Sequence, residues 1–424
     1  MRVGICGLGT VGSGLFNIFA NNSDEIARRT GAVPELVQVG CRRDHPDCDL
    51  SSTNVTRDIF DVARNPDVDL LVELIGGTDT AKDLVLEAIA NGKHVVTANK
   101  ALIALHGDEV FAAAARNGVT VRYEASIAGG IPIVKSIREG LAGNRIEWVA
   151  GIINGTSNFI LSEMARPGSN RSFDDVLKEA QDLGYAEADP TFDVEGIDAA
   201  HKLTILAAIA FGVPLNFPAM YTEGISMITS ADMQFADELG YRIRHLGIAR
   251  QRDDGVELRV HPTLVPTEQM LAQVDGVMNA VMVGSDAAGA TMYYGAGAGA
   301  GPTASAVMAD IIDAARSGQS LPGMGFARLK DSPIVSIENI SSSYYLRLCV
   351  VDRPGVMAHI SSILSDHEVS IEALIQKDAR RSDAQIVIVT NDVVESDINV
   401  AMSELEALGE VTTAISRIRV ADFR

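Results

Sequence analysis

The sequence has few cysteines, few aromatic residues and no long apolar run. Four cysteines among 424 residues do not form a disulfide framework, which fits a reducing compartment. The longest apolar runs, such as residues 203–212, are shorter than the about 20 residues that a membrane helix needs. The chain starts directly on a strand-like segment, so we expect no signal peptide and a cytoplasmic protein.

Positive charge is also scarce. The chain has 35 Lys and Arg residues against 56 Asp and Glu residues, which gives a formal net charge of −21. Nucleic acids and anionic membranes bind clusters of cations, so we expect neither as a partner. With 47 % hydrophobic and 21 % charged residues, the composition is that of folded domains with buried cores. At about 150 residues per domain, the length predicts roughly three domains.

The first third of the sequence alternates between strand-like and helix-like patterns. Short apolar segments predict strands at 3–6, 36–41, 69–75, 94–98 and 119–124. Helical spacing predicts helices over 10–29, 81–91 and 107–117. This alternation is typical of a parallel sheet with helices on both faces. We therefore predict an α/β domain with a doubly wound parallel sheet over residues 1–128.

The remaining two thirds predict two further domains. Residues 129–301 mix strands with helices, one of them expected over 232–245, and indicate an α+β domain for catalysis and dimerisation. A helix over 302–316 is expected to complete the first domain. After a link rich in Ser, Gly and Pro at 317–343, residues 344–424 have the order βαββαβ, which is typical of a ferredoxin-like fold.

A nucleotide-binding motif follows the first predicted strand. Gly7-Leu8-Gly9-Thr10-Val11-Gly12 has the form G-x-G-x-x-G and opens a predicted helix. In this pattern Gly7 permits the tight turn, Gly9 lets the backbone approach a pyrophosphate, and Gly12 lets helix and strand pack closely. The N–H groups at the helix start, at Thr10 and Val11, suit a phosphate. The motif predicts a Rossmann-type dinucleotide site.

The end of the second predicted strand bears on the choice between NAD and NADP. An acidic residue at this place binds the ribose 2′-hydroxyl of NAD, but this sequence has Arg42 and Arg43 there. Guanidinium groups can pair bidentately with a 2′-phosphate, so we predict NADP, with NAD as the other possibility. Alternatively, both arginines are solvated charges paired with Asp44 and Asp47.

Motifs spread over the whole chain carry a family resemblance. They are Glu73-Leu74-Ile75-Gly76-Gly77, Thr97-Ala98-Asn99-Lys100, Asn154-Gly155-Thr156-Ser157-Asn158, Gly196-Ile197-Asp198-Ala199-Ala200-His201-Lys202-Leu203 and Pro302-Thr303-Ala304-Ser305-Ala306. In this order they resemble homoserine dehydrogenase. The turn at residues 352–355 resembles an ACT domain, and the combination is similar to the longer, monofunctional members of that family.

The resemblance implies a reaction and its catalytic groups. The reaction is the reversible NAD(P)-dependent interconversion of L-homoserine and L-aspartate 4-semialdehyde, in the biosynthesis of threonine, methionine and isoleucine. Lys202 would donate a proton to the semialdehyde oxygen, Lys100 would assist near the nicotinamide, and Asp198 would orient the substrate or Lys202. The residues agree, because Lys100 follows a parallel strand and a lysine near a second cation can exchange a proton. The spacing alone favours an ordinary surface ion pair of Asp198 with Lys202, and the family resemblance reverses this preference.

Further ligand contacts are implied by the same resemblance. Glu187 would bind the substrate ammonium group, with Asp189 and Asp193 in support, although Asp193 also suits the positive end of the following helix. Gly76 and Gly299 would contact the cofactor.

A monovalent cation, with Na⁺ as the expected ion, would be held near the end of the first domain. By resemblance its ligands would be the carboxylate of Glu124 and the backbone of Ile127, Gly129 and Ile131. From the sequence alone, the same segment is a hinge between domains.

The resemblance to an ACT domain implies regulation. Threonine would bind near Asp352 and Gly355, where a helix start offers free N–H groups to a carboxylate. The alternative is a dimerisation module without a ligand. A homodimer or homotetramer is expected. Two other functions stay open at this point: another ACT-bearing hydroxy-acid dehydrogenase, and an amino-acid sensor without activity.

Overall fold

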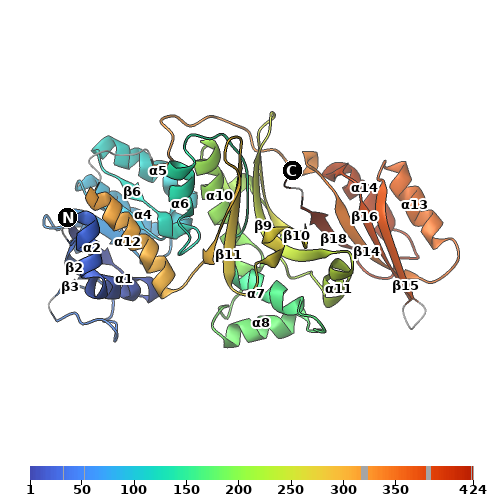
Figure 1. The fold of residues 1–424 in the computed structure, drawn as a ribbon, viewed down its shortest axis with the longest axis horizontal. Helices are drawn as coiled ribbons and strands as arrows, with labels where there is room; N and C mark the ends of the chain where they lie inside the picture. The colour runs from blue at the N-terminus through green and yellow to red at the C-terminus, as the bar shows by residue number, and fades with distance from the viewer. Residues whose placement is uncertain (32, 52, 317–322, 379–382, 422, 424) are drawn as a thin grey trace.

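The computed structural model describes residues 1–31, 33–51, 53–316, 323–378, 383–421 and 423. Figure 1 shows three parts in a row, with the N-terminal part in blue, the middle in green and yellow, and the C-terminal part in orange and red. The start of the predicted link, residues 317–322, lies outside the described residues. Among the described residues, no helix is long and apolar enough to cross a bilayer.

The N-terminal part is built on a six-stranded parallel sheet. Its strands are β1 (Arg2–Cys6), β2 (Glu35–Gly40), β3 (Asn54–Thr56), β4 (Leu70–Glu73), β5 (His94–Thr97) and β6 (Val121–Arg122). They lie in the order β3-β2-β1-β4-β5-β6, so the direction of winding reverses between β1 and β4. Ligands of such sheets bind beyond the carboxyl ends of the strands at this switch point. The predicted doubly wound sheet is confirmed.

Helices cover both faces of this sheet. On one face α1 (Thr10–Asn21) packs against α12 (Ala300–Arg316), which also contacts β5. On the other face α4 (Asp79–Ala90) packs between α3 (Ile59–Arg64) and α5 (Lys100–Asn117). The expected single helix over 10–29 is wrong, since α1 ends at Asn21 and α2 (Ser23–Thr30) starts anew. The strands β1 and β4 are fully buried apart from the first residue of β1, as expected between two helical layers.

The middle and C-terminal parts share one mixed sheet. Its strands are β7 (Ile146–Ile152), β9 (Tyr241–Gln251), β10 (Val256–Pro266), β11 (Met278–Ser285), β12 (Gly289–Ala296), β14 (Tyr344–Val351), β15 (Ile371–Asp378), β16 (Asp383–Thr390) and β18 (Ser416–Val420). Their order is β12-β11-β7-β9-β10-β18-β14-β16-β15, with the short β8 (Tyr221–Thr222) paired to β10. The C-terminal unit adds α13 (Val356–Asp366) and α14 (Glu395–Glu406), which completes the predicted βαββαβ order.

The junction between these two parts is β18. It pairs in parallel with β10, with Thr263 opposite Arg419 and Leu264 opposite Val420. Near the end of the chain, Phe423 stacks on Trp148 with ring centroids 5.5 Å apart. The sequence pattern predicted a separate C-terminal sheet behind a link, but this sheet continues that of the middle part.

The predicted helix over 232–245 is wrong. The helix α11 (Ser230–Glu238) stops early, and β9 starts at Tyr241. Between them Gly240 has a φ of +81°, a left-handed conformation that glycine adopts at little cost and that ends a helix. From Tyr241 onward the chain pairs residue by residue with β10, and this long-range pairing overrides the local helical spacing.

One helix links the two sheets. The helix α10 (Ile197–Phe211) packs against β7, β9 and β10 of the mixed sheet and against α5 of the nucleotide-binding part. It is buried all round from Asp198 to Ala210, as its nearly continuous apolar sequence predicts. Polar residues on this helix therefore lie at the boundary between the two parts.

Candidate active site

Two lysines from different parts of the molecule meet at one carboxylate. Lys100 Nζ lies 2.9 Å from Asp198 Oδ1, and Lys202 Nζ lies 2.6 Å from Asp198 Oδ2. The Lys100 side chain is 34 % exposed, whereas that of Lys202 is 11 % exposed and that of Asp198 is 5 % exposed. The three charges form a buried cluster that opens to solvent on the Lys100 side.

Backbone geometry explains how these residues reach each other. Lys100 is the first residue of α5, directly after β5, and the Asn99 side chain caps this helix by accepting from the N–H of Leu102 at 3.0 Å. Asp198 and Lys202 are four residues apart on α10 and so share one face. Because α10 packs beside α5, the start of one helix faces the first turn of the other.

Asn154 ties the cluster to the mixed sheet. Its Nδ2 donates to Asp198 Oδ2 at 2.8 Å and to Asp193 Oδ1 at 2.7 Å, while its Oδ1 caps α7 (Gly155–Met164) by accepting from the N–H of Ser157. Lys202 Nζ also donates to the carbonyl of Ile153 at 2.7 Å. Asn154 belongs to one of the sequence motifs, but the sequence alone predicted no role for it. Its place as a helix cap was the available signal, and its reach to Asp198 needed the fold.

The electrostatics of the cluster are those of a tightly held ion triad. Burial by itself would raise the pKa of Asp198, but the ammonium groups of Lys202 and Lys100 outweigh it and hold the carboxyl pKa well below its usual value. Burial lowers the pKa of Lys202, Asp198 opposes this, and the charge of Lys100 lowers it further. The pKa of Asp193 is raised, chiefly by burial. Lys202 is thus easier to deprotonate than an exposed lysine.

The glycine motif has the shape that a dinucleotide needs. Gly7 has a φ of +103°, and a Cβ on Gly12 would lie 2.0 Å from the carbonyl oxygen of Gly7, so neither position admits a side chain. A Cβ on Gly9, in contrast, would meet nothing within 4 Å. Thr10 starts α1 without a side-chain cap. The open space and uncapped N–H groups fit a pyrophosphate.

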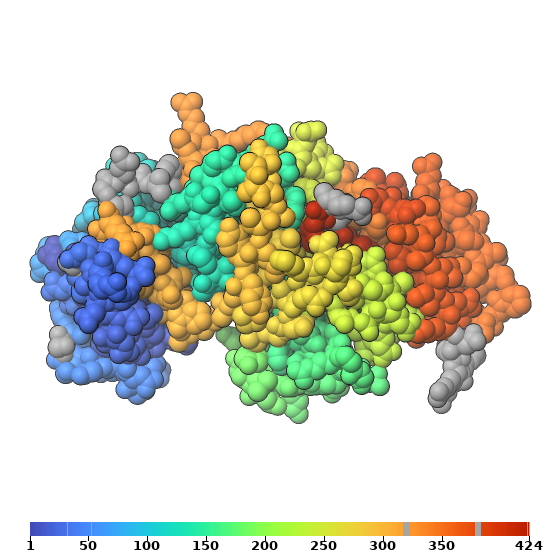
Figure 2. Space-filling view, viewed as in Figure 1, coloured from blue at the N-terminus to red at the C-terminus, as the bar shows by residue number. Residues whose placement is uncertain are grey.

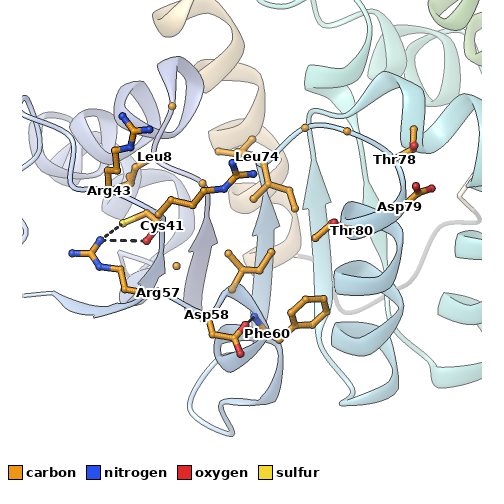
Figure 3. A pocket seen from close by; sticks show the side chains of 18 residues that line it. Leu8, Cys41, Arg43, Arg57, Asp58, Phe60, Leu74, Thr78, Asp79 and Thr80 are labelled. Carbon is orange, nitrogen blue, oxygen red and sulfur yellow. Dashed lines mark hydrogen bonds between the residues drawn. The ribbon is translucent and has the colours of Figure 1, made fainter.

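A cavity of about 890 Å³ extends from this motif across the carboxyl ends of β1, β2 and β4 (Figure 3). In Figure 3 Arg43 and Arg57 extend from one side of the cavity, and Thr78 and Asp79 lie at the other. Arg42 and Arg43 both line it, and Asp44 pairs with Arg57 at 2.8 Å instead of with either of them. Sequence analysis missed Arg57, which follows the short strand β3.

A second hollow of about 350 Å³ lies next to the first and is lined by Val11, Gly76 and Lys100 among others. The Phe192 ring forms part of its wall, with its centroid 5.6 Å from Lys100 Nζ. The two hollows have Leu74, Gly76 and Gly77 in common. An elongated ligand in both would run from the arginines to the lysine cluster.

Glu73 supports the floor of this second hollow and was not predicted. It is fully buried, accepts from Thr97 Oγ1 at 2.6 Å, and accepts from the N–H groups of Ile75 and Gly76 at 2.9 and 3.3 Å. These bonds join the ends of β4 and β5, immediately before Lys100.

The remaining predicted cofactor residue, Gly299, lies at the start of α12. It has a φ of +113°, and its carbonyl accepts from the N–H of Thr303 at 3.2 Å. Next to it, a Cβ on Gly14 of α1 would lie 2.7 Å from the carbonyl oxygen of Ala300. This end of α12 is therefore held against α1, close to the glycine motif.

The acidic loop before α10 splits into two environments. Asp193, in the short helix α9 (Thr191–Val194), faces Asn154 and the lysine cluster. Glu187 is exposed, and Asp189 is exposed and accepts from the N–H of Thr191. The structure brings Asp193 into direct contact with Asn154 of the cluster, whereas Glu187 contacts Gln181, whose Nε2 donates to its backbone carbonyl at 3.1 Å.

One of the predicted cation ligands, Glu124, is a buried carboxylate. Glu124 accepts from the N–H groups of Val134 and Lys135, each at 2.9 Å, and its own N–H donates to Asp310. Burial and the charge of Asp310 raise the pKa of Glu124 to about 7. Ile131 already accepts a backbone bond from Ile133. The pKa values of both buried carboxyl groups, Glu124 and Asp310, are raised by burial despite the nearby charges of Lys135 and Arg122, which fits a cation here.

The predicted effector residues lie at the far end of the molecule. Asp352 is exposed, and Gly355, with a φ of +97°, caps the start of α13. The neighbouring Arg353 pairs with Glu410 at 2.6 Å.

Comparisons with known proteins agree over the entire chain. Residues 7–124 match the family model "Homoserine dehydrogenase, NAD binding domain", residues 132–312 match "Homoserine dehydrogenase", and residues 344–410 match "ACT domain". The chain is 58 % identical to the homoserine dehydrogenase of Pseudomonas aeruginosa, over 99 % of this chain and 98 % of the relative. It is 40 % identical to that of Bacillus subtilis, over 99 % of this chain and 98 % of the relative.

Solved structures show the same similarity. A homoserine dehydrogenase from Thiobacillus denitrificans superposes with a TM-score of 0.93 at 52 % identity, covering 100 % of this chain and 98 % of that one. A hyperthermophilic archaeal homoserine dehydrogenase in complex with NADPH superposes with a TM-score of 0.63 at 25 % identity, covering 78 % of this chain and 99 % of that one.

Proposed function

Because the chain belongs to the homoserine dehydrogenase family, and is an NAD(P)-dependent oxidoreductase with an ACT domain, we propose that Lys202 transfers the proton and that Lys100 and Asp198 set its charge and position. The reaction is the interconversion of L-homoserine and L-aspartate 4-semialdehyde. One observation carries the assignment: two ammonium groups lie within 3 Å of the same buried carboxylate. An ordinary surface ion pair would need neither a second ammonium group nor a buried carboxylate.

Lys202 and Lys100 have different roles in the proposed proton transfer. When bound, the nicotinamide exchanges a hydride with the carbon that carries the oxygen, and the protein must handle the accompanying proton. Lys202, held by Asp198 and Ile153, gives this proton to the oxygen during reduction and takes it back during oxidation. Lys100 adds a second positive charge, which lowers the pKa of Lys202 and favours a developing alkoxide.

For the substrate, we propose Glu187 and Asp193 as partners of the ammonium group, with Asp189 in support. The contact of Asp193 with Asn154 supports this, because the same amide also holds Asp198. The partners of the substrate's ammonium group would then come from one short segment before α10.

We propose NADP as the preferred cofactor. Three arginines, Arg42, Arg43 and Arg57, line the cavity beside β2, and within the described ranges neither Arg42 nor Arg43 forms an ion pair. The cofactor would also contact Gly7, Gly9, Gly12 and, nearer the lysines, Gly76 and Gly299.

Steady-state kinetics with both cofactors test the function and this preference together. The wild type should oxidise NADPH with aspartate semialdehyde. The double change Arg42→Gln and Arg43→Gln should raise the KM for NADPH about tenfold or more, since charged hydrogen bonds are lost, and leave the KM for NADH nearly unchanged. Arg28→Gln on α2, an exposed arginine paired with Glu25, is the control. Equal losses with both cofactors would contradict the 2′-phosphate assignment.

We also propose a monovalent cation, Na⁺, at Glu124 with the backbone of Ile127, Gly129 and Ile131. The raised pKa values of the buried Glu124 and Asp310 carboxyl groups support it. Replacing Na⁺ by choline at constant ionic strength should lower the melting temperature, and restored Na⁺ should reverse the loss. Equal melting curves in the two salts would dismiss the site.

The remaining parts of the proposal concern assembly and regulation. A homodimer or homotetramer is supported by β12, an edge strand of the mixed sheet whose Tyr294 is 58 % exposed. Light scattering after gel filtration would give the subunit count. The proposed domains are residues 1–128, 129–301 and 344–424. The enzyme is proposed to be cytoplasmic and to act in threonine, methionine and isoleucine biosynthesis. Threonine is proposed as the effector of the ACT domain.

A further inference from the structure

Glu73 is a buried carboxylate that forms no ion pair with any of the described residues. Most other buried carboxylates differ in this respect. Those that pair with an arginine or a lysine are Glu163, Asp198, Asp232, Glu257, Glu395 and Glu410. Glu124 and Asp310 lie at the proposed cation site. Because a buried charge without a counter-charge is costly, Glu73 stands out as a group that a positively charged ligand would stabilise.

The hydrogen-bond partners of Glu73 suit its ionised form. Its Oε1 accepts from the N–H groups of Ile75 and Gly76 at 2.9 and 3.3 Å, and its Oε2 accepts from Thr97 Oγ1 at 2.6 Å. The Thr97 hydroxyl itself accepts from the N–H of Asn99 at 2.9 Å, so its single hydrogen is left for Glu73. A carboxyl group whose two oxygens both accept has the bonding pattern of a carboxylate anion.

Glu73 belongs to the wall of the second hollow. This hollow lies between the N-terminal and middle parts, because Lys100 comes from one and Phe192 from the other. On the face shown in Figure 2, the orange surface of α12 lies between the blue N-terminal part and the yellow surface of the middle part. Glu73 is 0 % exposed, so water screens its charge little. Lys100, the cation among the lining residues, already contacts Asp198, so the charge of Glu73 has no counter-charge in this wall.

The nicotinamide ring of the cofactor differs in charge between its two redox states. The oxidised ring carries a positive charge, and the reduced ring is neutral. Under the proposed function this ring lies in the second hollow. A fixed carboxylate at the wall attracts the oxidised ring and has no comparable effect on the reduced ring. The substrate's ammonium group is another cation that comes near, but its proposed partners are Glu187 and Asp193.

The glycine segment beside Glu73 leaves room for such a ring. Gly76 and Gly77 have φ values of +71° and +73°, and a Cβ on either would meet nothing within 4 Å. Glu73 holds the N–H groups at the start of this segment, and Asn99 Nδ2 donates to the carbonyl of Gly77 at 2.6 Å. The residues present therefore fit a flat ring beside a fixed negative charge.

We propose that the Glu73 carboxylate strengthens the binding of the positively charged nicotinamide of NADP⁺ relative to the neutral nicotinamide of NADPH. The inference rests on the proposed function, which places the nicotinamide in the second hollow. Glu73 acts through its charge and transfers no proton. It is a determinant of the preference between the two redox states of the cofactor.

Binding measurements on the full chain test this preference without turnover. Calorimetric titration gives the dissociation constants of NADP⁺ and NADPH. Glu73→Gln keeps the shape of the side chain and an oxygen that accepts from the two N–H groups, but removes the charge. It should weaken the binding of NADP⁺ about tenfold and change that of NADPH by less than about twofold. Equal changes for the two nucleotides, or no change for either, would overturn the proposal.

A fragment of the cofactor locates the effect. Adenosine 2′,5′-bisphosphate carries the 2′-phosphate but lacks the nicotinamide. The wild type and Glu73→Gln should bind it equally well. A loss as large as the loss for NADP⁺ would mean that Glu73 only maintains the shape of the larger cavity, and would refute the effect of its charge.

Two variants control for structural damage. Thr97→Val removes the hydrogen bond to Glu73 Oε2 but keeps the charge, so it should keep the ratio of the two dissociation constants. Glu163→Gln removes another buried carboxylate, one that lines neither hollow, and should also keep this ratio. A shift of the ratio in either variant as large as that in Glu73→Gln would contradict the assignment.

A second variant keeps the test valid if melting curves show that Glu73→Gln is not folded. Ala101 is half-buried in the wall of the same hollow, in the first turn of α5. Ala101→Asp adds a negative charge there, at a helix start that favours one. NADP⁺ should then bind severalfold more tightly relative to NADPH. An unchanged ratio in this variant would count against a positively charged ring in the hollow and overturn the proposal.

Rates separate this inference from the proposed function. Turnover of homoserine by the wild type, together with an unchanged ratio in Glu73→Gln, would defeat the role of Glu73 alone. A shifted ratio in a chain that does not turn over homoserine would defeat the proposed reaction and leave the role of Glu73 standing. A wild type that binds neither nucleotide would defeat both.

Discussion

The two sheets of this protein hold their functional groups in different ways. In the N-terminal sheet, the glycine motif and Lys100 follow β1 and β5, and Glu73 is the last residue of β4; these three strands are neighbours in the sheet. In the mixed sheet, β10 lies between β9, its neighbour in sequence, and β18, from the end of the chain. In the parallel sheet, the functional residues therefore lie along one edge because neighbouring strands end there. In the mixed sheet, neighbouring segments come from distant parts of the chain and meet only through packing.

Two buried lysines make the comparison concrete. Lys93, in the N-terminal part, donates to the carbonyls of Asn65 and Val68 at 2.6 and 2.8 Å and lines neither hollow of the active site. Lys202, at the boundary of the two parts, donates to a carbonyl and to Asp198. Burial lowers the pKa of both. One lysine closes a turn and the other faces the proposed reaction.

Exchanging each lysine for alanine should give the largest difference. Lys202→Ala should lower kcat by about 10²–10⁴-fold, the usual contribution of a proton-transfer group, with the KM for NADPH nearly kept. Lys93→Ala should lower the melting temperature, because two buried carbonyls lose their donor, and keep kcat. Initial rates and thermal melts on both variants check this. Near-normal turnover in Lys202→Ala would remove it as the proton donor.

The pH dependence should sharpen the same contrast. Lys202 must be protonated for reduction and neutral for oxidation, and its pKa lies below the ordinary lysine value of 10.5. Reduction should therefore fall, by up to about tenfold per pH unit, above an inflection below pH 10.5, while oxidation rises through the same inflection. Lys93→Arg should leave both profiles unchanged. Profiles that move in the same direction would contradict a shared acid and base.

Within the N-terminal sheet, two glycines of one motif should respond differently and with smaller effects. Gly12→Ala places a methyl group against the carbonyl of Gly7, so it should destabilise the fold by about 1–3 kcal/mol. Gly9→Ala meets no protein atom within 4 Å, so it should keep the melting temperature and raise the KM for NADPH severalfold. Chemical unfolding and cofactor kinetics distinguish the two. A stability loss at Gly9 equal to that at Gly12 would argue against an open pyrophosphate place.

How far the sequence could be interpreted depended on the range of the interactions. The strands β1, β2, β4 and β5 were predicted within a few residues because each is a compact apolar run. The helix predicted to His245 failed because Gly240 and the pairing of β9 with β10 override local spacing. The strand β3 and helix α3 are too short for a periodic signal, which is why Arg57 was missed.

Local sequence was enough to predict the nucleotide turn, the shared helix face of Asp198 and Lys202, and the family resemblance, because each depends on residues close together in the chain or on fixed motifs. Three contacts follow from the packing of the folded chain: Lys100 reaches the same carboxylate, Asn154 holds this carboxylate, and β18 joins the C-terminal unit to the mixed sheet. These contacts close long loops, and no local pattern specifies which distant segments will pair.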